Sequence, residues 1–155
     1  MMTFADLDRA VQATLASKRL GKPVFVRLTW QGLDRPEAVA PRLAQTMAVV
    51  QQWLGQPLDQ IYAIGSAASG QVALTLKFRE GATALVSFAR GQPRGAGIDL
   101  MVLGNHGAIY HDAGSAPLWD EPLVPAGQPD PAVLALVERA LRSHQPESAG
   151  TGGKP

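Results

Sequence analysis

The chain has 155 residues, of which 46% are hydrophobic and 17% charged, and its formal net charge is +1. A chain this apolar has enough surface to bury for one folded domain, and its near-neutral charge gives no electrostatic reason to expect nucleic acid or an anionic membrane as a partner. Because there is no cysteine, disulfides, thiolate catalysis and cysteine-ligated metal centres are excluded.

Neither a targeting segment nor a membrane span is expected. The N-terminal segment carries acidic residues early and has no long apolar core, so it does not have the pattern of a signal peptide. No stretch approaches the roughly 18 consecutive apolar residues that a membrane span needs. The expectation is a soluble, cytoplasmic protein.

The chain begins with a predicted helix followed by a strand. Thr3 is a good N-cap, apolar residues then recur every three or four positions, and Gly21 and Pro23 mark the end of the helix. The period changes to two over residues 24–30, which is typical of a half-buried strand.

A second helix is predicted over about residues 38–54. Pro41 is tolerated only in the first turn, so the helix is expected to start near residue 40. The pattern that follows is rich in strands, and Glu80–Gly81 predicts the turn of a hairpin. Strands are expected over residues 61–65, 72–78, 83–90, 98–102 and 108–111.

The last predicted element is a third helix. Asp130–Pro131 supplies an N-cap with proline at the first helical position, and the apolar period continues to about Arg142. Residues 144–155 have no periodicity and no apparent apolar anchor, so we expect a disordered, dispensable tail. The folded domain is then expected to span residues 1–143.

This order of elements predicts an α+β fold, in which helices pack on one face of a mostly antiparallel, open β-sheet. The strands over 83–90 and 98–103 carry apolar or small residues on both faces. A monomer would leave one of those faces in water, so we expect a homo-oligomer, most simply a dimer. The candidate interface residues are Leu85, Leu100, Met101 and Leu103. Either Leu100 or Met101 would face the partner, depending on the strand register.

Three polar residues are candidates for chemistry: His106, His111 and Asp112. A metal site or a His–Asp acid/base pair would use such groups. Residues five apart on a strand point to opposite faces, so His106 and His111 are not expected to share one ion. The alternative is that all three are surface residues of turns, and we expect no bound metal.

Glycine-rich stretches raise the question of phosphate binding. Residues 65–70 and 104–107 lead into strands and therefore lack the helix N-terminus that a phosphate cradle needs. The loop over 91–97, with Arg90 and Arg94, could hold an anion. A mobile hairpin loop is the alternative interpretation.

Several segments, taken in chain order, point to a known family. They are Arg19-Leu-Gly-Lys-Pro23 before the first strand, Trp53-Leu-Gly55 at the end of the second helix, Val72 to Phe78 with Glu80-Gly-Ala-Thr83, and Met101 to Tyr110. Together, over about residues 5–112, they resemble the C-terminal, substrate-binding domain of the Gfo/Idh/MocA oxidoreductases, the glucose–fructose oxidoreductase and inositol dehydrogenase family. The resemblance implies that the open sheet face makes dimer or tetramer contacts.

The sequence departs from this family at its catalytic motifs. Family members normally carry a Rossmann domain that holds NAD(P), and a Glu-Lys-Pro motif with a catalytic lysine. This sequence has no Gly-x-Gly-x-x-Gly before the resemblance, and Lys22 is not at the place of that motif. The family's Asp-x-Gly-x-His-x-x-Asp motif falls on Pro41, Leu43, Gln45 and Ala48, and none matches. Gln45 cannot titrate where the family has histidine.

These departures predict a non-catalytic binding or assembly module that uses no cofactor and associates with itself through its sheet face. The alternative is a substrate-domain subunit of a split NAD(P)-dependent oxidoreductase, acting with a separate Rossmann-domain protein. A third hypothesis, an independent small-molecule or anion binder, would use Arg90 and Arg94.

Overall fold

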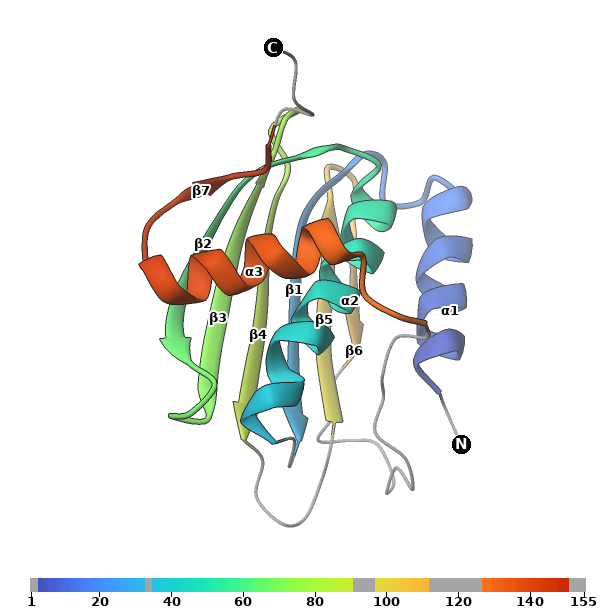
Figure 1. The fold of residues 1–155 in the computed structure, drawn as a ribbon. Helices are drawn as coiled ribbons and strands as arrows, with labels where there is room; N and C mark the ends of the chain where they lie inside the picture. Colours follow the sequence, from blue (N-terminus) through green and yellow to red (C-terminus); the bar gives the residue numbers. More distant parts are fainter. Residues whose placement is uncertain (1–2, 33–34, 91–96, 112–126, 151–155) are drawn as a thin grey trace.

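The computed structural model describes residues 3–32, 35–90, 97–111 and 127–150, in which three helices accompany seven strands (Figure 1). The helices are α1 (Phe4–Ala16), α2 (Pro36–Leu54) and α3 (Pro131–Ser143). The strands are β1 (Pro23–Gly32), β2 (Leu58–Ser66), β3 (Gln71–Phe78), β4 (Thr83–Arg90), β5 (Gly97–Gly104), β6 (Ala108–His111) and β7 (Glu147–Ser148). Among the described residues, no helix is long and apolar enough to cross a membrane.

The strands form one sheet in the order β6–β5–β1–β4–β3–β2–β7. The neighbours β1 and β4 are parallel, and every other described pair is antiparallel. Three helices with a mixed, mostly antiparallel sheet confirm the prediction of an α+β fold. All six strands expected from the alternating pattern are present, and β7 is an addition to them.

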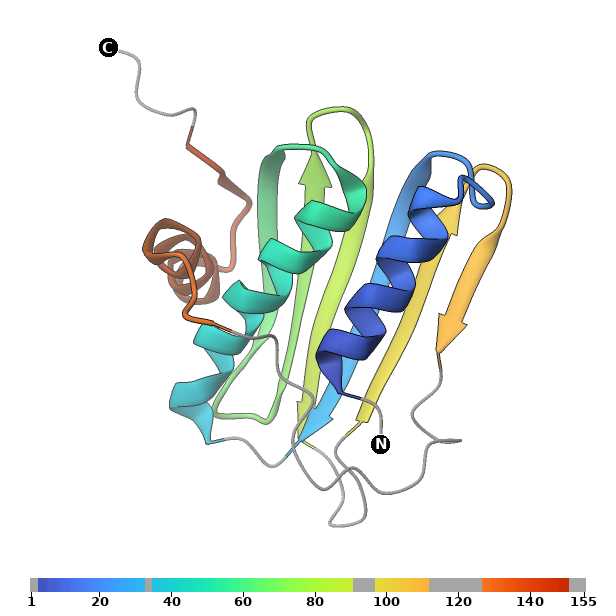
Figure 2. The same cartoon turned by 90° about the vertical axis from the view of Figure 1, so that its right-hand side faces the viewer.

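Each central strand alternates between a buried position and a more exposed one, as a period of two requires. The buried positions include Val26, Leu28 and Trp30 of β1, Val72, Leu74 and Leu76 of β3, Ala84, Val86 and Phe88 of β4, and Ile98, Leu100 and Val102 of β5. α2 packs against β1 and β4, α3 packs against β2 and α2, and α1 packs against α2 (Figure 2). The core therefore lies between the helices and the alternate side chains of the sheet.

The second helix begins earlier than expected. α2 starts at Pro36 rather than near residue 40, so Pro41 lies inside the helix. Val39 is fully buried in the core one turn before Leu43, and this packing outweighs the helical hydrogen bond that Pro41 cannot donate. The expected start near residue 40 is wrong for that reason.

Part of the expected tail is ordered. β7 pairs with β2, and the backbone N–H of Ala149 donates to the carbonyl of Asp59 at 2.9 Å. The Arg139 guanidinium lies 3.2 Å from the Glu147 carboxylate, and Ala149 packs against the core. The expectation of a disordered tail is therefore wrong for residues 144–150, because it overlooked the anchor at Ala149. Residues 151–155 lie outside the described residues.

The loop between α1 and β1 is fixed to the turn between β5 and β6. The Leu20 carbonyl accepts the backbone N–H of His106 at 2.9 Å, and the side-chain oxygen of Asn105 accepts the backbone N–H of Lys22 at 2.8 Å. The two chain segments are so close that a Cβ on Gly104 would clash with the Leu20 carbonyl oxygen. The glycine-rich segment over 104–107 therefore has a structural role here.

This close approach predicts different costs for two neighbouring glycine substitutions. Gly104→Ala is expected to lower the free energy of unfolding by about 1–3 kcal/mol, because the added methyl group meets backbone rather than a flexible side chain. Gly107→Ala is the matched control. A Cβ there would lie at an ordinary 3.5 Å from the Leu20 side chain, so the change should be within about 0.5 kcal/mol. Urea unfolding of both variants measures the difference, and equal stabilities would contradict the packing described.

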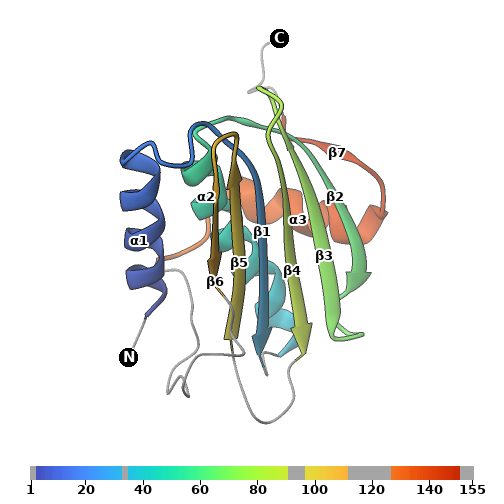
Figure 3. The ribbon, with the colours of Figure 1, turned by 180° about the vertical axis from the view of Figure 1, so that it is seen from behind.

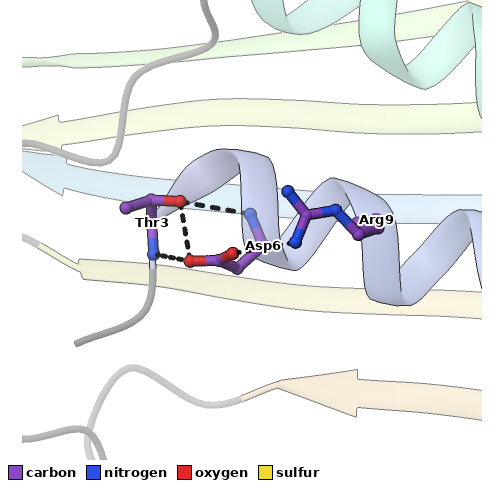
Figure 4. Close-up of polar contacts among 3 residues, drawn as sticks. All are labelled: Thr3, Asp6 and Arg9. Carbon is purple, nitrogen blue, oxygen red and sulfur yellow. Dashed lines mark hydrogen bonds and ion pairs between the residues drawn. The ribbon is translucent and has the colours of Figure 1, made fainter.

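A capping box starts α1, with Thr3 as the N-cap that the sequence predicts (Figure 4). The backbone N–H of Asp6 donates to the Thr3 hydroxyl oxygen at 3.2 Å, and the backbone N–H of Thr3 donates to the Asp6 carboxylate at 2.9 Å. The Thr3 hydroxyl also donates to that carboxylate, at 2.8 Å. These hydrogen bonds, the one from the Thr3 backbone first, lower the pKa of Asp6, and the Arg9 guanidinium 3.3 Å away lowers it further.

The lowered pKa of Asp6 gives the cap a pH dependence with a definite sign. Because the folded state binds the Asp6 proton more weakly than the unfolded state, the contribution is present above the ordinary pKa of about 3.9 and is lost as the pH falls below it. Asp6→Asn is therefore expected to melt at a lower temperature than the parent at pH 7, with the gap closing toward pH 2.5. Glu138→Gln, an exposed carboxylate lost from α3, is the control. A gap that stays constant with pH would contradict this role of the carboxylate.

Candidate functional site: the open face of the sheet

The side chains that alternate with the core positions form the second face of the sheet, here called the open face. Figure 3 views the sheet from the side away from α2 and α3. The strand register aligns six of these positions into one row across β6, β5, β1, β4, β3 and β2. In that order the row is Tyr110, Met101, Arg27, Leu85, Thr75 and Tyr62.

Apolar side chains are exposed on this face. Five large hydrophobic residues are exposed in the described part of the chain, and four of them are at open-face positions. Those four are Tyr110 at 71%, Ile64 at 55%, Leu103 at 38% and Tyr62 at 36% exposure. Monomeric proteins seldom leave apolar side chains exposed together on one surface, so this face has the character of an interaction surface.

The register decides which of the predicted interface residues reach this face. Leu85, Met101 and Leu103 are at open-face positions. Leu100 is only 3% exposed and pairs with Leu28 and His111, on the core side of the sheet. Leu100 is therefore corrected from a candidate interface residue to a core residue, and Met101 is the alternative that the register supports.

The middle of the open face is built from smaller and polar side chains. The hydroxyl groups of Thr29 and Ser87 are hydrogen-bonded at 2.8 Å across the parallel β1–β4 pair. Ala73, next to Ser87 on β3, and Ala89 on β4 are half-buried. These short side chains lie next to the longer side chains of Arg27 and Leu85 in the same two strands.

The histidine candidates lie apart. His106 is exposed in the turn between β5 and β6, where its backbone bonds to Leu20. His111 ends β6 on the core side, opposite Leu100 in the register. Asp112 lies outside the described residues, so a His111–Asp112 pair stays a prediction. Within the described ranges, no group of three or more His, Asp or Glu side chains could hold a metal ion.

The arginine loop is only partly described. Arg90 is exposed at the end of β4, and its backbone N–H donates to the Gly70 carbonyl at 2.7 Å. Gly70 has a positive φ of 80°, and a Cβ there would lie 3.2 Å from the Arg90 side chain. Arg94 lies outside the described residues, so the anion-binding hypothesis stays a prediction.

Sequence reasoning missed one cluster beside α2. The Arg42 guanidinium lies 5.3 Å from the centroid of the Trp30 ring, which in turn is 4.5 Å from the Phe88 ring. The indole nitrogen of Trp30 is buried and has no hydrogen-bond partner among the residues that the structure describes. These side chains come from α2, β1 and β4. Contacts between separate elements cannot be predicted from the spacing of residues along the sequence.

Two of the positions that align with the family's acid–base motif, Leu43 and Gln45, make structural contacts in this chain. Leu43 is fully buried in the core, and Ala48 is exposed on α2. The side-chain amide of Gln45 donates to the carbonyl of Gly127. Near the end of α2, the Gln56 side-chain oxygen accepts the backbone N–H groups of the β3–β4 turn at 3.1 and 3.2 Å. These glutamine amides hold backbone groups in place.

No protein-family model and no curated protein matches the sequence. Solved structures do match the fold. A probable dehydrogenase from Thermotoga maritima has a TM-score of 0.68 and 14% identity, and the match covers 94% of this chain and 62% of that one. A putative myo-inositol dehydrogenase from Sinorhizobium meliloti 1021 has a TM-score of 0.70 and 15% identity, over 92% and 62%. The myo-inositol dehydrogenase from Lactobacillus casei in complex with NAD(H) and myo-inositol has a TM-score of 0.64 and 14% identity, over 96% and 60%.

These matches place nearly the whole of this chain on part of a longer chain. The chain spans about three fifths of the length of the three solved structures named above. Its resemblance to one domain of these enzymes, predicted from the order of sequence segments, is confirmed at the level of the fold. The chain has the fold found in one part of the Gfo/Idh/MocA-type inositol dehydrogenases.

Proposed function

We propose that this protein is a non-catalytic binding or assembly module that associates with a second copy of itself through the open face of its sheet. The observation that carries the proposal is the exposed apolar content of that face, from Tyr110 on β6 to Tyr62 and Ile64 on β2. In this arrangement the helices cover one face of the sheet, and the second copy covers the other.

The size of the open face supports a second copy as its occupant. Six strands spaced about 4.8 Å apart, with two open-face side chains on β6 and three or four on each other strand about 6.7 Å apart, give a face on the order of 700 Å². A stable interface of standard size buries about 800 Å² on each partner. One copy of the same face is therefore a sufficient partner, and no additional surface is required.

The surroundings of Gln45 support the absence of catalysis. Where the resembled family has a histidine for proton transfer, this chain has an amide that cannot titrate, and that amide is used to hold the Gly127 carbonyl. The neighbouring Leu43 fills the core at another position of the same motif. Neither side chain can act as a general acid or base.

Sedimentation velocity of the purified chain at micromolar concentration tests the proposal, with a matched pair of variants. The wild type is expected to sediment as a dimer. Met101→Asp, on the open face, is expected to keep the fold and sediment as a monomer, because the interface would have to bury a carboxylate. Leu100→Asp, one residue away on the core side, is expected to unfold the chain.

The two variants also give the results that would contradict the proposal. A wild type that sediments as a monomer would contradict the proposed self-association. If Met101→Asp remained dimeric, another surface would be responsible. Circular dichroism of each variant separates loss of association from loss of fold, since only Leu100→Asp should lose its native spectrum.

A second candidate function is favoured by the extent of the structural matches. The Lactobacillus casei enzyme holds NAD(H) and myo-inositol in a chain of which this protein matches 60%. This protein would then be the substrate-domain subunit of a split NAD(P)-dependent oxidoreductase. A separate Rossmann-domain protein would supply the nicotinamide cofactor.

Calorimetric titration with NADH and NADPH distinguishes these functions. The chain alone is expected to give no heat of binding at micromolar cofactor, because it has no glycine-rich strand-to-helix turn of the dinucleotide-binding type. Micromolar binding by the chain alone would contradict the proposed module. Binding that appears only after addition of a separate Rossmann-domain chain would favour the split oxidoreductase.

A further inference from the structure

A cleft between α2 and α3 lies on the helix side of the molecule, away from the open face. It has a volume of about 520 Å³, and the two helices pack against each other beside it (Figure 1). Small-molecule sites usually measure about 300–1,000 Å³, so the cleft is large enough for such a ligand. Its polar lining residues are Gln51, Gln52, Gln56 and Asp130, and its apolar ones include Pro57 and Val133.

Gln56 provides a hydrogen-bond donor that is held in place and has no acceptor. The residue is only 3% exposed, and its Oε1 accepts the backbone N–H groups of Glu80 and Ala82 at 3.1 and 3.2 Å. Its Nε2 has no hydrogen-bond partner among the described residues. Because Nε2 is not fully enclosed by protein, it faces open space, and the open space that Gln56 lines is the cleft. An oxygen atom of a ligand would satisfy this donor.

Asp130 provides a negative charge at the α3 end of the cleft. Its Oδ1 caps α3 by accepting the backbone N–H groups of Ala132 and Val133 at 2.7 and 3.4 Å. Its Oδ2 has no hydrogen-bond or ion-pair partner in the part of the chain that the structure describes. Among the described residues that line the cleft, Asp130 is the one charged group. The cleft therefore favours a neutral or cationic ligand over an anion.

The C-terminal end of α2 adds negative character to the same cleft. Gly55, the C-cap of α2, lines the cleft, and the last turn of α2 contains no basic residue. The backbone carbonyls at a helix C-terminus carry a partial negative charge that favours a nearby cation. Two separate features of the cleft, this helix end and Asp130, thus favour a positive group on the ligand.

We propose that this cleft binds a small molecule that carries a cationic amine beside a carbonyl group. Gln56 Nε2 donates to the carbonyl oxygen, and the ammonium group lies toward Asp130 and the end of α2. The side chains of Gln51 and Gln52, to which no described residue is hydrogen-bonded, can donate to the one group or accept from the other. The site needs neither a second copy nor the open face, so its test is independent of the proposed self-association.

Titration of the wild type with three matched ligands tests the chemistry of the site. Leucinamide carries both groups, 4-methylpentanamide lacks the amine, and 3-methylbutylamine lacks the carbonyl. Leucinamide is expected to bind with a dissociation constant on the order of 1 mM, which is usual for so small a ligand, and each of the other two at least about fivefold more weakly. Amide-correlation NMR measures binding as saturable shifts of the backbone signals of Gly55, Gln56 and Val133.

Two nearly isosteric variants connect each ligand group with its residue. Gln56→Glu keeps an oxygen for the β3–β4 turn and removes the donor, so it is expected to abolish the preference for leucinamide over 3-methylbutylamine. Asp130→Asn keeps a side chain that can cap α3 and removes the charge, so it is expected to abolish the preference for leucinamide over 4-methylpentanamide. If Gln56→Glu fails to fold, Asp130→Asn decides the question. Preferences that survive in the folded variants would overturn the proposal.

A second pair of variants tests the location of the site. Ala48 is exposed on α2 and lines the cleft, so Ala48→Phe is expected to fill it and to weaken leucinamide binding at least about tenfold. Ala135→Phe, at an exposed position of α3 that does not line the cleft, is the control and should bind as the wild type does. Shifts that do not saturate in the wild type, equal affinities for the three ligands, or unchanged binding by Ala48→Phe would each overturn the proposed site.

Discussion

The alternation of side chains along each strand is the constraint on which the rest of this structure depends. Once β1 is fixed with Val26, Leu28 and Trp30 toward the core, its intervening residues must point to the opposite face. The register of β1 with β4 and β5 then carries the same division across the sheet. A shift of one residue in any strand would exchange the two faces, so the core and the open face are specified together.

Much of the fold could be predicted because its signals are local. The cap at Thr3 and the period-two strands depend on neighbouring residues, and the structure contains each of them. The start of α2 depends on the burial of Val39 in the core, which is a tertiary contact. This contact outweighs the unfavourable effect of Pro41 inside the helix. The pairing of β7 likewise depends on the contact of Ala149 with the core. The local sequence, which is rich in glycine and proline, gives no pattern that predicts this contact.

For the candidate site, the sequence predicted which strand is involved but not which of its two faces is open. The pattern of β5 offers Leu100 or Met101, and only its pairing with β1 and β6 decides between them, because the decision depends on which face the neighbouring strands bury. The contact of Arg42 with Trp30 was beyond prediction for a related reason. Its partners meet only after α2 has packed on the sheet.

The packing of α2 also shows what two residues aligned with the resembled family's motif do in this chain. In the helix that aligns with the resembled family's acid–base motif, Leu43 is committed to the core and Gln45 to a backbone carbonyl. Both side chains now stabilise the layer of helices, and neither is free to move a proton. The open face differs, because four of its large apolar side chains remain exposed. Substitutions on that face can therefore change the exposed surface while the core stays intact.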